Sequence, residues 1–218
     1  MESQVRGGTR WKRFAVVMVP SVAATAAIGV ALAQGALAAS FSVSGQSFKV
    51  SADYLHGEGF SQYGAVDSGY TLAGKQTLHP VAVSAFTDAR IQNMCQSVVT
   101  PNIPLLGSVT LTLKAGDSQD ESKQVTASNL YIDVEDLGTS KAVFNGMDIG
   151  VGAGSITKGP KVKADEVKQQ QANPYGFAQQ ATSADLYDVK QTAWATTAGT
   201  FTLPGLHMSL SANGSECY

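Results

Sequence analysis

Residues 109–114 read Val-Thr-Leu-Thr-Leu-Lys, and this stretch decides the fold class. Val109, Leu111 and Leu113 alternate with polar residues, so in an extended strand the apolar side chains fall on one face and the polar ones on the other. A helix would need apolar residues every three or four positions, and this stretch has none at that spacing. The stretch therefore predicts a half-buried β-strand.

The same two-residue period recurs on both sides of this strand. It covers four further stretches: Phe48–Ala52, Val81–Ala85, Met147–Val151 and Leu206–Leu210. After residue 125 the apolar positions change phase near Asn129, which predicts a β-bulge inside one strand. The glycine-rich stretch 54–74 predicts irregular strands and turns. The polar stretch 158–174 predicts an exposed loop, with a short helix over 162–171 as the alternative.

We predict an all-β fold, an antiparallel sandwich or barrel-like domain with some long strands, preceded by one N-terminal apolar helix. An irregular β-helix is the alternative, because a small-small-Asp/Asn pattern recurs at residues 51–53, 127–129 and 183–185. The three copies are unequally spaced, which does not fit a regular solenoid. Asp or Asn where a strand starts or bulges explains the pattern equally well.

The N-terminus combines positive charge with a long apolar run. The segment Phe14–Ala39 carries no charge and follows Arg6, Arg10, Lys12 and Arg13, a pattern that predicts export. Small residues at Ala36 and Ala38 favour a cleaved signal peptide, whereas about 20 uncharged residues suffice to span a bilayer and favour a retained anchor. Both interpretations predict a leader or anchor over 1–39 and an exported β-domain over 40–218. The protein is then expected at the outer face of the cytoplasmic membrane or outside the cell.

Small residues recur at every fourth position of the apolar run, at Ala23, Ala27, Ala31 and Gly35. On a helix they form one smooth ridge, which is the pattern that lets membrane helices pack closely. A retained anchor is therefore expected to attach the protein to the membrane and to support a homo-oligomer. An Ala-rich signal sequence produces the same spacing by chance.

Charge and cysteine content describe the exported part further. Residues 14–218 carry 11 Lys and Arg against 16 Asp and Glu, and this acidic balance argues against nucleic acid as a partner. The two cysteines, Cys95 and Cys217, lie in a chain directed to an oxidising compartment. We therefore predict one disulfide between them, with two unpaired thiols as the alternative.

Several segments together resemble an actinobacterial family of exported proteins. They are Arg10–Phe14 before the Ala-rich run, Phe48–Ala52, His79–Val81, Cys95–Ser97 and Gln191–Thr200. The resemblance covers nearly the whole chain and implies an exported protein of unknown function, although members are sometimes labelled cholesterol esterase. An esterase of the α/β-hydrolase type needs Gly-x-Ser-x-Gly between a strand and a helix. This chain has no such motif, since Ser155 after Gly152-Ala153-Gly154 has the wrong spacing.

Other site chemistries have weak support in the sequence. His56, His79 and His207 are far apart and show no metal-ligand spacing, so we predict no metal and no cofactor. His207 is expected to face solvent, because it alternates with apolar neighbours. Neither of two clusters of acidic residues matches a calcium-binding loop. The first is interpreted as a solvated turn and consists of Asp117, Asp120 and Glu121. The second is interpreted as exposed carboxylates on a strand and consists of Asp133, Glu135 and Asp136.

Two functions of different classes remain. The first is an exported cell-envelope protein without catalytic activity, which binds an apolar small molecule such as a lipid or acts in envelope assembly. The second is a lipid or sterol ester hydrolase, with a serine, an Asp and either His56 or His79 brought together by the fold. The export pattern, the strand pattern and the lack of a catalytic motif favour the first.

Overall fold

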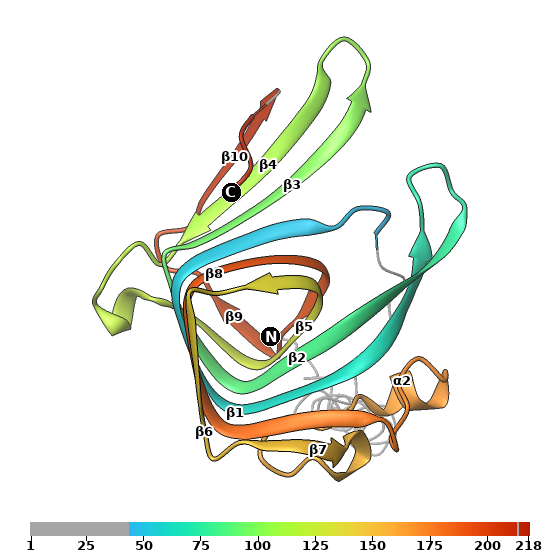
Figure 1. Ribbon diagram of the computed structural model, residues 1–218. Helices are drawn as coiled ribbons and strands as arrows, with labels where there is room; N and C mark the ends of the chain where they lie inside the picture. Colours follow the sequence, from blue (N-terminus) through green and yellow to red (C-terminus); the bar gives the residue numbers. More distant parts are fainter. Residues whose placement is uncertain (1–43, 213) are drawn as a thin grey trace, which may run out of the picture. The chain divides into compact units, whose positions relative to one another are not determined.

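The computed structural model describes residues 44–212 and 214–218 (Figure 1). Within these residues the chain forms ten strands and short helical turns. The strands are β1 (Phe48–Tyr70), β2 (Gln76–Gln92), β3 (Met94–Ile103), β4 (Gly107–Ala115), β5 (Val125–Gly138), β6 (Lys141–Asn145), β7 (Asp148–Gly152), β8 (Phe177–Thr197), β9 (Thr200–Thr202) and β10 (His207–Ala212). The predicted N-terminal helix and its ridge of Ala23, Ala27, Ala31 and Gly35 lie outside the described residues.

The strands form one sheet in the order β10-β4-β3-β1-β2-β5-β8-β6, with β7 paired to β8 and β9 paired to β5. An additional pairing joins β1 to β8, so β1, β2, β5 and β8 form a ring (Figure 1). The predicted antiparallel all-β fold with long strands is confirmed. The pairings among the described strands are antiparallel, so the alternative of an irregular β-helix, which coils through parallel strands, is wrong.

Along one line across the sheet, the side chains of the four ring strands change the face toward which they point. In β1, Leu55 and Phe60 belong to the same buried core although they are an odd number of residues apart. The change falls at Gly59, where φ is +64°, and in β5 it falls at Asn129, where φ is +46°. The pairs on either side of this line, here called the crease, place four residues on it: Thr182, Gly59, Thr87 and Asn129. This crease confirms the predicted change of phase near Asn129.

The prediction of irregular strands and turns over 54–74 holds only at its end, where residues 71–74 form a turn, because β1 continues unbroken as far as Tyr70. A glycine at the crease is what keeps the strand continuous. A Cβ at Gly59 would meet the Thr87 hydroxyl at 2.4 Å, and a positive φ strains other residues. Glycine here therefore bends a strand instead of ending it.

Two apolar cores lie on opposite faces of the ring strands. The inner core collects Leu55, Phe60, Phe86 and their neighbours, and the outer core includes Tyr63 and Val83. The chain between β7 and β8, which contains the short helix α2 (Ala164–Lys168), supplies further outer-core residues (Figure 1). Part of the stretch predicted as an exposed loop therefore covers a face of the sheet. Among the described residues, no helix combines the length and apolar character needed to cross a membrane.

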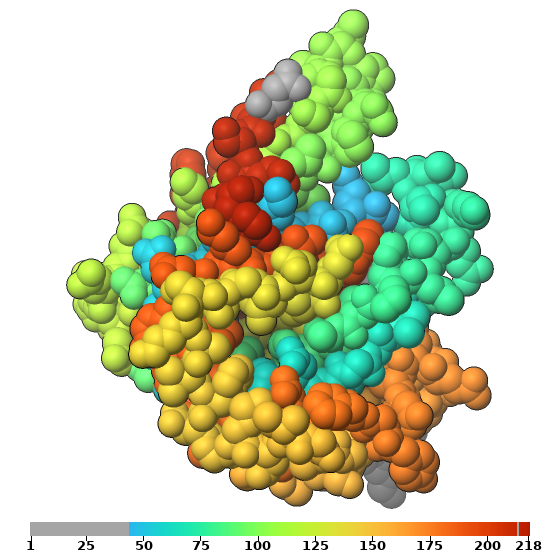
Figure 2. All heavy atoms as spheres, in the orientation of Figure 1, coloured from blue at the N-terminus to red at the C-terminus, as the bar shows by residue number. Residues whose placement is uncertain are grey.

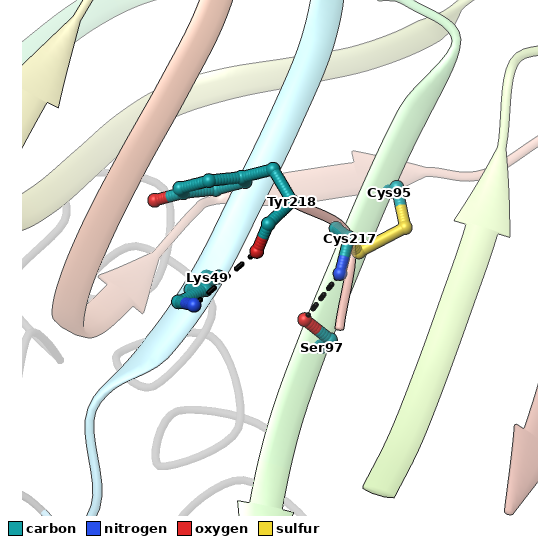
Figure 3. The surroundings of a disulfide bond; sticks show 5 residues. All are labelled: Lys49, Cys95, Ser97, Cys217 and Tyr218. Carbon is teal, nitrogen blue, oxygen red and sulfur yellow. Dashed lines mark hydrogen bonds between the residues drawn. A yellow bond between two sulfur atoms is a disulfide. The ribbon is translucent and has the colours of Figure 1, made fainter. Parts of the chain in front are cut away.

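Strands β3, β4 and β10 extend from the ring as an arm (Figure 1). Cys95 in β3 is bonded to Cys217, with their Cα atoms 5.8 Å apart, which confirms the predicted disulfide. Figure 3 shows that the C-terminal tail lies across β3 and β1 at this bond. The Cys217 amide donates to the Ser97 hydroxyl at 3.0 Å, and the Lys49 ammonium donates to the Tyr218 carbonyl at 3.2 Å.

Candidate functional site

A cavity of about 140 Å³ lies inside the ring. All four ring strands and β6 contribute to its wall, and most of the contributing side chains are apolar. They are Leu55, Phe60, Gln62, Ser84, Phe86, Ile132, Leu137, Phe144, Leu186 and Gln191. Figure 2 shows a hollow in the molecular surface beside the yellow segment that contains β6. The cavity is therefore a product of ring closure, because its wall needs strands from both ends of the domain.

Aromatic rings form much of the apolar wall. The Phe60 ring lies 5.4 Å from that of Phe86 and 5.1 Å from that of Phe144, measured between centroids. Phe86 fits only because position 57 is glycine, since a Cβ there would lie 2.1 Å from the Phe86 ring. Such tilted aromatic pairs are rigid and apolar, and they suit contact with a hydrocarbon ligand.

One side of the cavity is polar. The Gln62 side-chain amide donates to the Ser84 hydroxyl at 2.8 Å and accepts from the Gln179 amide at 2.5 Å. Ser84 and Gln191 are buried in the wall. Apolar pockets with a few fixed polar groups orient amphipathic ligands, because the polar groups select one end of the molecule.

A second, polar pocket of about 510 Å³ lies against other residues of β1, β2 and β8. Its wall consists mainly of charged and amide side chains: Tyr54, His56, Arg90, Gln92, Gln119, Glu121, Gln124 and Asp185. Pairing across the sheet places His56 between Arg90 and Asp185. Arg90 also forms an ion pair with Glu121, from the connection between β4 and β5.

His56 has a carboxylate at each ring nitrogen. Its Nδ1 lies 2.7 Å from Asp185 Oδ1, its Nε2 lies 3.1 Å from Glu58 Oε1, and the Tyr54 hydroxyl donates to Asp185 at 2.5 Å. Hydrogen bonding to Asp185 raises the pKa of His56, and hydrogen bonding from His56 lowers the pKa of Asp185. The arrangement favours an imidazolium that donates from both nitrogens, which is the wrong protonation state for a general base.

The two pockets open on opposite faces of β1. Leu55 lines the cavity inside the ring, and His56, the next residue, lines the polar pocket. Successive side chains of a strand point to opposite faces, so His56 does not reach a ligand held against Leu55. The fold brings His56 and an Asp together, as the hydrolase hypothesis required, but it places Glu58 where that hypothesis needed a serine.

Residues 44–218 match a family of unknown function, DUF6230. The chain belongs to the DUF6230 family. The matched region begins at Ser44, just before β1, and contains the whole of the described β-domain. No curated protein and no solved structure gave a significant match. The Cys95–Cys217 disulfide of this DUF6230 protein is consistent with an extracytoplasmic location.

A buried charged cluster lies on the outer face of the DUF6230 domain. Lys163 Nζ lies 3.0 Å from Glu166 Oε1 and 4.0 Å from Asp133 Oδ1, and the Tyr63 hydroxyl donates to Glu166 at 2.9 Å. Asp133 is only 4% exposed, so its prediction as an exposed carboxylate is wrong. The covering segment that contains Lys163 is what buries it. Burial raises the pKa of Asp133 to about 7, with Asp67 and Glu166 adding to the rise and Lys163 opposing it.

Asp133 is expected to make the free energy of unfolding fall as the pH rises from about 4 to about 7. Its folded pKa of about 7 exceeds the ordinary value of 3.8, so over this range the folded state holds more protons than the unfolded state. The Asp133→Asn variant should show a flatter profile when urea unfolding is measured across this range. Asp148→Asn is the control, because an ion pair with Lys158 lowers the pKa of Asp148, and this variant should keep the decline. If the free energy of unfolding changed equally with pH in wild type and Asp133→Asn, the raised pKa of Asp133 would be contradicted.

The remaining histidines of the DUF6230 domain occupy separate places. His79 stacks on Trp194 with 3.5 Å between ring centroids, and His207 is exposed on β10, as predicted. Among the described residues, no group of three or more His, Cys, Asp or Glu side chains is arranged to hold a metal ion. Sequence reasoning missed the pairing of His56 with Asp185, because no local motif connects residues that meet only through strand pairing.

Proposed function

We propose that this protein is an exported, non-catalytic cell-envelope protein whose β-domain binds the apolar part of a lipid or a similar small molecule inside the ring. The observation that carries the proposal is the cavity of about 140 Å³ between the ring strands. An engineered apolar cavity of about 150 Å³ in another protein holds benzene. By that comparison the cavity takes one small ring or the end of an acyl chain, and the remainder of a longer ligand extends through the opening.

Binding is favoured over ester hydrolysis by the position of the ionisable groups. Among the described residues, the polar groups that reach the cavity are the amides of Gln62 and Gln191 and the hydroxyl of Ser84. They can bind and orient a ligand, but the wall that the structure describes contains no histidine beside them. His56 lies on the other face of β1, between two carboxylates. A triad needs its histidine within reach of both the nucleophile and the ester carbonyl.

Placement in the envelope rests on the N-terminus. The apolar run Phe14–Ala39 directs export, and it either remains as an anchor at the outer face of the cytoplasmic membrane or is removed from a secreted protein. If the anchor remains, close packing along Ala23, Ala27, Ala31 and Gly35 would produce a homo-oligomer. The intact mass of the protein in membrane and culture-medium fractions distinguishes the two forms.

The binding proposal is tested by blocking the opening of the cavity. Leu137 lines the cavity and is 38% exposed, so Leu137→Trp adds bulk at the opening without entering the inner core. We expect this variant to bind a fluorescent fatty acid about tenfold more weakly than wild type, since a lost 1.4 kcal/mol of apolar contact has that effect. Titration followed by fluorescence measures the affinity.

Ile149→Trp is the matched control, because Ile149 is also apolar and exposed but lies on β7 and does not line the cavity. It should bind like wild type. Equal affinities of all three proteins, or no binding by wild type, would contradict the proposal. Mass spectrometry of lipids extracted from the purified protein then identifies the natural ligand.

A further inference from the structure

Two hairpins of the domain end in exposed leucines. The connection between β1 and β2 carries Leu72, which is 60% exposed, beside Tyr70, which is 54% exposed. The connection between β3 and β4 carries Leu105 and Leu106, and Leu105 is fully exposed. Figure 2 shows the β3–β4 hairpin, in green, standing clear of the body of the domain. Single exposed apolar residues are common on proteins, but leucines at the ends of two projecting hairpins require an explanation.

Both hairpin ends are almost free of charge. Residues 100–109 contain no charged side chain, and residues 68–78 contain only Lys75. About a quarter of the residues in an ordinary globular protein are charged. The ends therefore lack the charged groups that would resist transfer out of water, and the one charge present is positive, the sign that anionic lipid headgroups attract.

The described chain begins between these two hairpins. Gly45 lies against the β1–β2 connection, where a Cβ would come within 2.7 Å of backbone atoms of Tyr70, Thr71 and Leu72. The Gln46 side-chain amide donates to the Val99 carbonyl of β3 at 2.6 Å, so the residue that follows Gly45 contacts the other hairpin. The start of the domain is thus fixed to both hairpins at once.

This position limits how far the apolar run can lie from the hairpins. The run ends at Ala39, five residues before Ser44, and five extended residues span at most about 17 Å. If the run is in a membrane, the first described residues therefore lie within about 17 Å of that membrane. These are the residues that contact the two hairpins. The chain connection alone therefore places a bilayer near the two hairpins.

We propose that the ends of the β1–β2 and β3–β4 hairpins dock into the lipid bilayer that holds the N-terminal segment, with Leu72, Leu105 and Leu106 entering its outer leaflet. Insertion removes the leucine side chains from water, and each buried leucine favours the docked state by about tenfold. The domain is then held at two further points and does not swing freely on its tether.

The shape of the hairpin ends favours a bilayer over a second copy of the chain. A stable protein interface buries about 1,200–2,000 Å² between complementary surfaces. Two narrow projections offer little area to a partner of fixed shape, whereas lipid adapts to each projection separately. This inference does not depend on the cavity inside the ring, since none of the three leucines lines it.

The test measures the depth of each hairpin end in a membrane. Full-length Leu105→Trp and Leu72→Trp variants are reconstituted in vesicles of phosphatidylcholine and phosphatidylglycerol, with or without bromine on the acyl chains, which quenches tryptophan fluorescence on contact. Ile149→Trp is the matched control, because Ile149 is 69% exposed on β7, away from both hairpin ends (Figure 1). Trp11 and Trp194 are present in every protein and cancel when the parent signal is subtracted.

We expect the added tryptophans at positions 72 and 105 to be quenched by the brominated lipid and that at position 149 to be unaffected. Quenching no greater than that of Ile149→Trp would overturn the proposal. A blue shift that grows with protein concentration and resists brominated lipid would also overturn it, in favour of a second copy of the chain. Leu106→Trp repeats the measurement if Leu105→Trp does not fold. Fatty-acid binding by Leu137→Trp is measured separately.

Discussion

Replacing Cys95 and Cys217 together by serine is expected to lower the free energy of unfolding by about 2–5 kcal/mol. The bond joins residues 122 apart in the sequence, so its loss releases a long loop in the unfolded chain. It also loosens the tail from β3, where the hydrogen bond from Cys217 N to Ser97 would remain (Figure 3). Urea unfolding of the wild type and the double variant measures the difference.

A suitable control weakens the tail without touching the disulfide. Lys49→Met removes the ion pair between Lys49 and Glu216, which is partly exposed, and exposed pairs contribute about 0–1 kcal/mol. This variant should therefore unfold close to wild type. If the double serine variant unfolded like wild type, or if reduction left the wild-type midpoint unchanged, the bond would not stabilise the domain.

Phe86→Ala is expected to lower the free energy of unfolding by about 3–5 kcal/mol, because truncating a buried phenylalanine loses apolar burial and leaves a void. Phe86 is 2% exposed, contacts Phe60 and lines the cavity inside the ring. The void should join that cavity, so the variant is expected to regain stability when benzene is added, whereas wild type should gain less. Thermal unfolding with and without benzene measures both effects.

The same substitution at Phe201, which is 38% exposed on β9, is the control for the chemical change itself. Phe201→Ala should cost clearly less and should show no rescue by benzene. Similar losses at positions 86 and 201 would mean that Phe86 is not part of a closed apolar wall.

Local pattern was a good guide to where strands lie. Residues 109–114 lie in β4 as predicted, although Thr110 is the buried side chain there and Val109, Leu111 and Leu113 are half-buried. The change of phase near Asn129 marks a real change of face. Both features depend only on neighbouring residues and on the period of two in a strand. The disulfide was also predictable, because two cysteines in a chain predicted to be exported have one simple pairing.

Failures of the sequence analysis came where distant residues decide the outcome. Glycines over 54–74 suggested turns, but the crease partner Thr87 makes Gly59 part of a bent strand. The local pattern predicted Asp133 to be an exposed carboxylate, but the distant segment around Lys163 covers it. The wall of the cavity comes from five strands, and no local motif carries information about which of them meet.

Closure of the ring has a consequence for how the chain reaches its native state. Phe48 at the start of β1 pairs with Ala193 near the end of β8, so this ladder forms only after almost the whole chain has emerged. If the protein is exported with its N-terminus first, as proposed, a long strand edge therefore stays unpaired until β8 arrives. Contacts between such distant residues fold slowly, and unpaired edges aggregate. We accordingly expect the refolding yield to fall steeply as protein concentration rises.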